Sequence, residues 1–229
     1  MSVDEPPVGF EEQAIEAQNK AAFLMALRAR GIRDLGLLRA LEAVPREIFV
    51  PHRFADLARR PIALPLRCGQ TLPEPWLTAK MIEALAPLPC HRVLEIGTGS
   101  GYATALLARL AREVLSIERF KTLAIEAEAR LARLAITNAG VVFGDGLAIS
   151  PKIGPFDRVI VQSLLAEVPE NLVAALGEDG ILVAARPDPK SLSRQHIAQL
   201  ARNGAGGIDE NPVCPSRLQA LLPGEALAL

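Results

Sequence analysis

The chain has 229 residues, of which 50% are hydrophobic, and its formal net charge is −1 at pH 7. This length allows one large domain or a domain with appendages, and the near-neutral charge, without a long Lys/Arg run, argues against a nucleic-acid partner. No apolar run reaches the roughly 18–20 residues that span a bilayer, so we expect no membrane partner.

The N-terminal part of the chain predicts two helices. Apolar residues at mixed spacings of three and four predict a helix from about 14 to 30, and Gly31 is a suitable residue to end it. A second helix is predicted over 35–43, before Pro45, because the residue that precedes a proline disfavours the helical conformation.

A proline-rich segment follows, from 45 to 76. It holds six prolines, but it also carries large apolar residues such as Phe49 and Phe54. We therefore expect ordered, irregular structure that packs on a neighbouring surface rather than a flexible linker. Residues 1–76 are interpreted as N-terminal helices with this segment as a cap, and residues 77–229 as an α/β domain whose sheet extends into the C-terminal part.

From residue 77 onwards, helical and strand-like segments alternate. Strands are predicted at 92–96, 113–118, 140–143, 157–161 and 180–184, and helices at 77–86, 102–111, 120–135 and 169–176. Such alternation is typical of βαβ units with a parallel sheet. Two further strands, at 196–200 and 218–222 with a hairpin-like connection, would extend the sheet. The predicted fold class is α/β, with a doubly wound, mostly parallel, seven-stranded sheet and an N-terminal helical and irregular cap.

Cysteine and histidine are too scattered to predict a metal site or a disulfide framework. The chain has three residues of each type, and no ligand spacing relates them. A reducing compartment fits this pattern, and the acidic N-terminus has no basic-then-apolar signal segment. We therefore expect a cytoplasmic protein without a metal, and the sequence does not predict an oligomeric state.

A glycine loop connects the strand at 92–96 to an alanine-rich helix, and it reads Gly97-Thr98-Gly99-Ser100-Gly101. Glycines at such a turn let a ligand approach the backbone, and the helix N-terminus points into the same space. Nicotinamide-binding folds require G-x-G-x-x-G or A, but the third position here is Tyr102 or Thr104. The spacing E-x-G-x-G-x-G, which begins at Glu95, instead resembles the first motif of S-adenosylmethionine-dependent methyltransferases. We therefore expect Glu95 and the loop residues 97–101 to bind that cofactor.

Two acidic residues follow the next two predicted strands. Glu118 ends the strand at 113–118, where a carboxylate can accept hydrogen bonds from both hydroxyls of a ribose. Asp145 lies in Gly144-Asp145-Gly146, where its carboxylate could accept from an adenine amino group. Because the carboxyl ends of parallel strands meet at one sheet edge, we expect Glu118, Asp145 and Gly146 to converge with the glycine loop on S-adenosylmethionine.

Several segments, in the same order along the chain, resemble one protein family. Residues 44–51 read VPREIFVP and closely resemble the family's VPRE-x-FVP segment, and Gly69-Gln70-Thr71-Leu72 resembles its GQTI segment. Residues 93–102 match VLEIGTGSGY throughout. On these motifs the chain resembles the protein-L-isoaspartate O-methyltransferase family, and the matches run from about residue 28 to about 185.

The resemblance implies a Rossmann-like methyltransferase fold and S-adenosylmethionine as the cofactor. It also implies an acceptor, the carboxylate of an isoaspartyl residue in a damaged peptide or protein. Gln70 and Thr71 would then lie at the acceptor site, and the segment 45–76 would cover the cofactor. A carboxylate is nucleophilic at neutral pH, so the protein would contribute mainly positioning and the exclusion of water.

Two places depart from the family's pattern. The resemblance implies a serine within GQTIS whose hydroxyl lies near the substrate and the transferred methyl. Here Pro73 takes its place, and proline has neither a hydroxyl nor an amide donor. After the strand at 157–161 the family has small residues, whereas this chain has Gln162-Ser163-Leu164-Leu165. A divergent paralogue that binds the cofactor but has another acceptor, or has lost methyl transfer, is therefore an alternative. A nucleic-acid methyltransferase is disfavoured, because the motif that handles exocyclic amines is missing after that strand.

Overall fold

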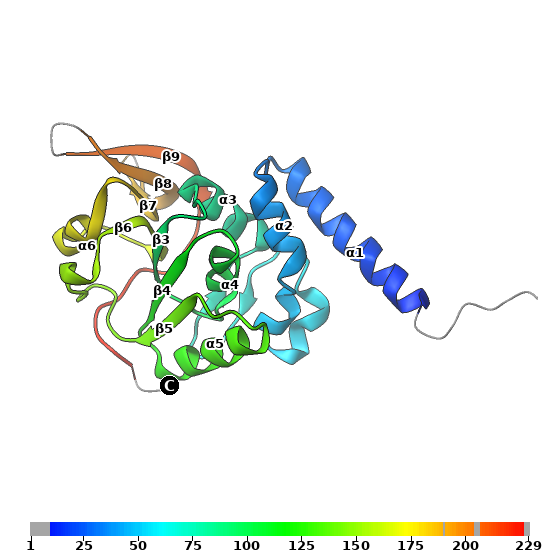
Figure 1. Cartoon of the computed structure of the whole chain (residues 1–229). Helices are drawn as coiled ribbons and strands as arrows, with labels where there is room; N and C mark the ends of the chain where they lie inside the picture. Colours follow the sequence, from blue (N-terminus) through cyan, green and yellow to red (C-terminus); the bar gives the residue numbers. More distant parts are fainter. Residues whose placement is uncertain (1–9, 190, 204–206, 227–229) are drawn as a thin grey trace, which may run out of the picture.

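The computed structural model describes residues 10–189, 191–203 and 207–226, and its centre is a seven-stranded sheet (Figure 1). The strands are β3 (Arg92–Ile96), β4 (Glu113–Glu118), β5 (Ala139–Phe143), β6 (Phe156–Leu164), β7 (Leu176–Asp188), β8 (Ser191–Arg202) and β9 (Ile208–Ser216), in the order β5-β4-β3-β6-β7-β8-β9. The strands from β5 to β7 are parallel, and β8 and β9 pair antiparallel. The strand order reverses at β3 and β6, the place where open α/β sheets bind ligands.

Both faces of the sheet are buried, because neighbouring residues of the central strands enter different cores. Val93 and Ile160 pack in a core with helices on one face, whereas Leu94 and Val159 pack in a second core on the other. Continuous burial on both faces is typical of parallel strands that helices cover. The helices are α1 (Phe10–Ala29), α2 (Leu35–Ala43), α3 (Pro75–Leu85), α4 (Tyr102–Ala108), α5 (Lys121–Arg133) and α6 (Glu170–Ala175).

The segment between α2 and α3 is ordered and largely irregular, as predicted. It contains the short 3-10 helices η1 (Arg46–Phe49) and η2 (His52–Leu57) and a small hairpin of β1 (Leu64–Pro65) and β2 (Thr71–Leu72). Phe49 is fully buried in the core that also holds Leu37 of α2 and Val93 of β3. One hydrophobic core therefore continues across the predicted boundary at residue 76, and the division into two domains stays a prediction.

The predicted seven-stranded fold is confirmed, but the prediction of its last strand is wrong. The strand lies at Ile208–Ser216, and residues 218–222 instead run across the ends of the other strands, with an isolated bridge between Leu164 and Ala220. Pro212 and Pro215 made the stretch 208–216 resemble a connection. It forms the edge strand of the sheet, where a proline can be tolerated because only one side of the strand must pair.

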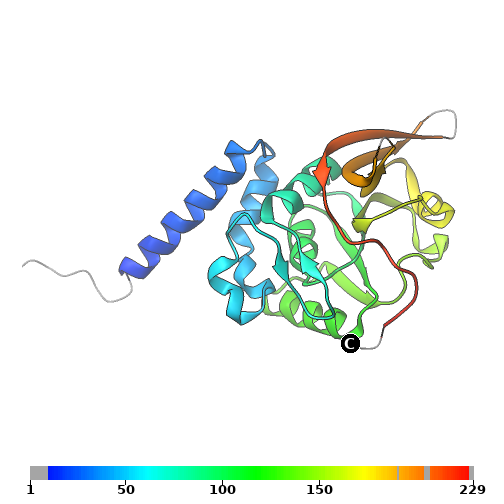
Figure 2. The same cartoon turned by 180° about the vertical axis from the view of Figure 1, so that it is seen from behind.

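The C-terminal segment after β9 reaches the far side of the sheet. Figure 2 shows it in red, passing from β9 along the strand ends toward α5. Ala226 forms a bridge with Phe120, which directly precedes α5. This path brings residues 217–226 over the carboxyl ends of β6 and β4.

Within the described residues, no helix has the length and apolar character needed to cross a membrane.

Candidate active site

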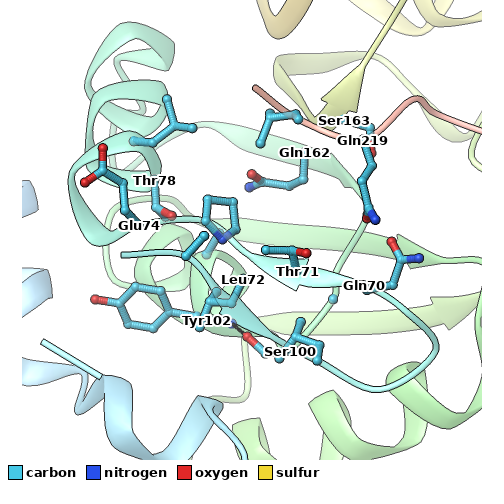
Figure 3. A pocket seen from close by; sticks show the side chains of 18 of the residues that line it. Gln70, Thr71, Leu72, Glu74, Thr78, Ser100, Tyr102, Gln162, Ser163 and Gln219 are labelled. Carbon is cyan, nitrogen blue, oxygen red and sulfur yellow. Dashed lines mark hydrogen bonds between the residues drawn. The ribbon is translucent and has the colours of Figure 1, made fainter. Parts of the chain in front are cut away.

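A cavity of about 550 Å³ lies at the carboxyl ends of the central strands, within the size range of sites for small molecules. The glycine loop and Glu118 line one part, and residues 70–74 of the cap segment line another (Figure 3). A smaller cavity of about 200 Å³ adjoins it, because both are lined by Gln70, Gly97, Glu118, Ser163 and Gln219.

The glycine loop has a backbone that only glycines adopt readily. Gly97, Gly99 and Gly101 have φ angles of 91°, 56° and 86°, all in the left-handed region. A Cβ atom on Gly101 would also lie only 3.1 Å from the Cβ of Ala127 in α5. Thr98 and Ser100, the residues between the glycines, line the large cavity. The loop therefore presents its backbone to the ligand space, as the sequence predicted.

Glu118 lies where the two cavities meet and is fixed by backbone amides. One carboxylate oxygen accepts from the Gly99 amide at 2.8 Å, and the other accepts from the Phe120 amide at 2.9 Å. Burial raises the pKa of Glu118, while these amide hydrogen bonds act to lower it. The structure thus brings the predicted ribose ligand to the glycine loop, and its contact with a ribose stays a prediction.

Glu95, predicted to bind the cofactor, lies beneath the site instead of in it. It is fully buried and is not among the residues that line either cavity. Its carboxylate accepts from the Thr104 hydroxyl, from the Ser116 hydroxyl at 2.8 Å and from the Gln162 amide at 3.0 Å. Burial raises the pKa of Glu95 to about 7. Since Gln162 lines the cavity, Glu95 acts on the site by orienting Gln162.

Asp145 is held by one backbone amide of its own loop and one of the C-terminal segment. One carboxylate oxygen accepts from the Leu147 amide at 2.8 Å, and the other from the Gly224 amide at 2.7 Å. Asp145 lines neither cavity, whereas Gly146 lines the smaller one. A Cβ atom on Gly146 would lie only 2.3 Å from Ile96 Cγ2, so a larger residue would not fit at this position. In this structure the Asp145 carboxylate binds the C-terminal segment. A contact between Asp145 and adenine therefore stays a prediction.

The residues predicted at the acceptor site come together. Gln70, Thr71 and Pro73 line the large cavity, whereas Leu164 does not, so the altered loops leave the cavity open. Arg46 of the VPRE segment fixes Pro73 from behind: its guanidinium donates to the Pro73 carbonyl at 2.6 Å and to the Ala58 carbonyl at 2.6 Å. Burial lowers the pKa of Arg46 to about 10, which leaves it charged at neutral pH.

Two segments cover the cavities, of which the sequence predicted only the cap segment and not the C-terminal one. The Gln219 side chain donates to the Gly69 carbonyl at 3.0 Å, which joins the C-terminal segment to the β1–β2 hairpin. The same segment is fixed to the sheet because Leu164 donates to the Gln219 carbonyl at 2.8 Å. Gln162 and Ser163 belong to the loop that was expected on the acceptor side, whereas Thr78 and Gln219 were not predicted at the site.

A seven-stranded sheet of this order, with a glycine loop after β3 and an acidic residue at the end of β4, defines a class I S-adenosylmethionine-dependent methyltransferase. The residues present fit that cofactor. The Gly99 amide and the Glu118 carboxylate face a cavity of suitable size, and an added Cβ on Gly99 would point at Leu66 of the covering hairpin, 3.6 Å away.

The chain belongs to the protein-L-isoaspartate O-methyltransferase family. Residues 18–218 match the family described as Protein-L-isoaspartate(D-aspartate) O-methyltransferase (PCMT). The chain is 47% identical over 210 residues to a protein-L-isoaspartate O-methyltransferase of Rhodopseudomonas palustris (strain BisA53), covering 92% of this chain and 96% of the relative. It is 43% identical over 205 residues to that of Caulobacter sp. (strain K31), covering 90% and 93%.

Solved structures agree with this fold. A protein-L-isoaspartate O-methyltransferase superimposes with a TM-score of 0.75 at 26% identity, covering 88% of this chain and 65% of that one. A putative member from Plasmodium falciparum, in complex with S-adenosyl-L-homocysteine, has the same TM-score at 22% identity and covers 89% and 98%. The predicted family, fold, enzyme class and cofactor, S-adenosyl-L-methionine, are thereby confirmed.

Proposed function

We propose that this chain methylates the carboxylate of isoaspartyl residues in damaged peptides or proteins. The observation that carries the proposal is the continuity of the large cavity. It joins the glycine loop and Glu118 to Gln70, Thr71 and Pro73, so a methyl donor and a peptide acceptor can meet in one space. The relatives' shared name supports the choice of acceptor.

When bound, S-adenosyl-L-methionine supplies an electrophilic methyl group, whose transfer to a carboxylate oxygen forms one C–O bond, breaks one C–S bond and moves no proton. The protein needs no general base for this reaction, and its task is to bind, orient and exclude water. Glu118 and the glycine loop hold the donor. The hydrogen bond from Gln219 to the Gly69 carbonyl joins the two segments that cover the cavity.

One cationic side chain at the large cavity can pair with an anionic acceptor. Arg217 is the one cation among the residues that line it in the described part of the chain, and it is exposed. Of the two acidic lining residues, Glu74 is paired with Arg30 at 2.8 Å, and Glu118 is occupied by backbone amides. Among the described residues the Arg217 guanidinium forms no ion pair, so it is available to an incoming carboxylate.

The test is incubation with S-adenosyl-L-methionine labelled in its methyl group and a synthetic isoaspartyl peptide. We expect a base-labile methyl ester on that peptide and none on the same peptide with an ordinary aspartyl residue. No ester on the isoaspartyl peptide, from a protein that binds S-adenosyl-L-homocysteine, would refute the proposed acceptor.

A second candidate is a methyltransferase of the same fold with a different acceptor. The observation that favours it is Pro73, which lines the cavity where the family serine would place a hydroxyl. The same assay with a mixed cytosolic protein extract as acceptor separates the two functions. Label that persists after mild base would indicate methylation of nitrogen or sulfur instead of a carboxylate.

A further inference from the structure

Thr78 of α3 carries a buried hydroxyl that the protein leaves unused. The residue is 2% exposed, and its Oγ1 has no hydrogen-bond partner in the described part of the chain. Thr78 nevertheless lines the large cavity. Figure 3 places it beside Glu74, with Gln162 and Ser163 on the other side of the cavity.

The usual partner of a helical threonine hydroxyl is already occupied. That partner is the carbonyl four residues earlier, here the Glu74 carbonyl, which accepts from the Leu77 amide at 3.1 Å and from the Thr78 amide at 3.3 Å. Leaving a buried hydroxyl without a partner is unfavourable. A valine would fill the same space without that cost. A ligand that binds the hydroxyl would therefore account for a threonine at this position.

Pro73, which lies close to Thr78 in the chain, indicates which group of a ligand the Thr78 hydroxyl would bind. Pro73 stands where the family serine would present a hydroxyl to the acceptor, and its carbonyl is bound to Arg46 at 2.6 Å. Pro73 directly precedes Glu74, and Thr78 lies one helical turn after Glu74. Both residues line the same cavity, so a hydroxyl lost at one position is present at the other.

We propose that the Thr78 hydroxyl donates a hydrogen bond to the acceptor carboxylate and so replaces the absent serine. This inference rests on the proposed isoaspartyl acceptor. Binding of the carboxylate gives the buried hydroxyl its partner, and a hydrogen bond to a charged oxygen is stronger than one between neutral groups. Thr78 then governs the binding and orientation of the peptide, whereas Glu118 and the glycine loop govern the cofactor.

The first test compares Thr78→Val with Thr78→Ser. Valine keeps the shape and removes the hydroxyl, whereas serine keeps the hydroxyl. We expect Thr78→Val to lower kcat/KM for an isoaspartyl peptide about tenfold, the effect of one hydrogen bond to a charged group, with an unchanged Kd for S-adenosyl-L-homocysteine. Thr78→Ser should stay within about threefold of the native chain.

The stability of the Thr78→Val chain should not fall, because it loses only an unpaired hydroxyl. Should that chain nevertheless fail to fold, Thr78→Ala provides the same comparison with Thr78→Ser. A hydroxyl-free variant with native kcat/KM would overturn the assignment, and so would equal losses in the serine and valine chains.

A second test returns the serine to its family position. We expect Pro73→Ser, introduced into the Thr78→Val chain, to restore most of the lost kcat/KM, which a purely structural role of Thr78 would not allow. If the double variant has the same kcat/KM as the Thr78→Val chain, the proposal that the Thr78 hydroxyl replaces the serine hydroxyl is wrong. If the native chain forms no ester at all while it binds S-adenosyl-L-homocysteine, the proposed function fails, and this inference fails with it.

Discussion

The Glu118 carboxylate accepts a hydrogen bond from the Gly99 amide at 2.8 Å, across the carboxyl ends of β3 and β4. The residue predicted to hold the ribose therefore also fixes the loop on which the rest of the cofactor would lie. Its second oxygen is bound by the Phe120 amide. The geometry of the loop thus depends on the side chain that is predicted to bind the ribose.

Replacing Glu118 by alanine should weaken the binding of S-adenosyl-L-homocysteine by about 1–3 kcal/mol, the cost of lost hydrogen bonds to a charged group. Titration calorimetry measures this change. Glu128→Ala removes an exposed carboxylate from α5 and serves as the matched control, with native affinity expected. An unchanged affinity in the Glu118→Ala chain would remove Glu118 from the cofactor site.

Glu95 should make the stability of the protein depend on pH. Its pKa in the folded chain is raised to about 7 from an ordinary value of 4.5, because burial disfavours the charged form. The unfolded chain releases this proton first as pH rises. The contribution of Glu95 to the free energy of unfolding is therefore fully present below about pH 4.5 and is lost as pH rises through about 7.

The Glu95→Gln chain should lack this loss, which amounts to about 2–3 kcal/mol in the free energy of unfolding. Urea denaturation between pH 5 and pH 8, compared with the native chain and with Glu128→Gln, measures the difference. Parallel curves for the native and Glu95→Gln chains would show that the buried carboxyl keeps an ordinary pKa.

Gly101→Ala should destabilise the fold by about 1–3 kcal/mol, because alanine is strained at a positive φ. The added methyl would also press on Ala127 of α5, 3.1 Å away. Thermal denaturation checks this, with Gly140→Ala as control, since a Cβ on Gly140 meets no atom within 4 Å and its φ is not positive. Equal stability of the two variants would contradict the packing argument.

Arg217→Ala should raise the KM for an anionic isoaspartyl peptide about two- to fivefold, as expected for the loss of one exposed charge contact. The effect should shrink as salt is added, because exposed charges are screened. Arg112→Ala, which removes another exposed arginine, provides the control. A KM for the Arg217→Ala chain that equals the native KM at low salt would mean that Arg217 does not attract the acceptor.

The central sheet could be predicted from sequence because its signals are local. The runs at Val159-Ile160-Val161 and Ile181-Leu182-Val183 are apolar throughout, as strands buried on both faces require. β9 was misplaced because Pro212 and Pro215 indicate a connection unless the strand lies at an edge. Strand position in a sheet is not encoded within the strand itself, so no local pattern could correct this.

By itself, the sequence determined the glycine loop, the acidic residue that ends β4, and the motifs of the cap segment, since each depends on residues adjacent along the chain. Only the tertiary structure decided that Glu95 lies under the site, that Asp145 binds Gly224, that Gln219 reaches Gly69, and that the Thr78 hydroxyl has no partner. The physical reason is that hydrogen bonding and burial depend on which distant segments meet in space, and that is settled only when the whole chain has folded.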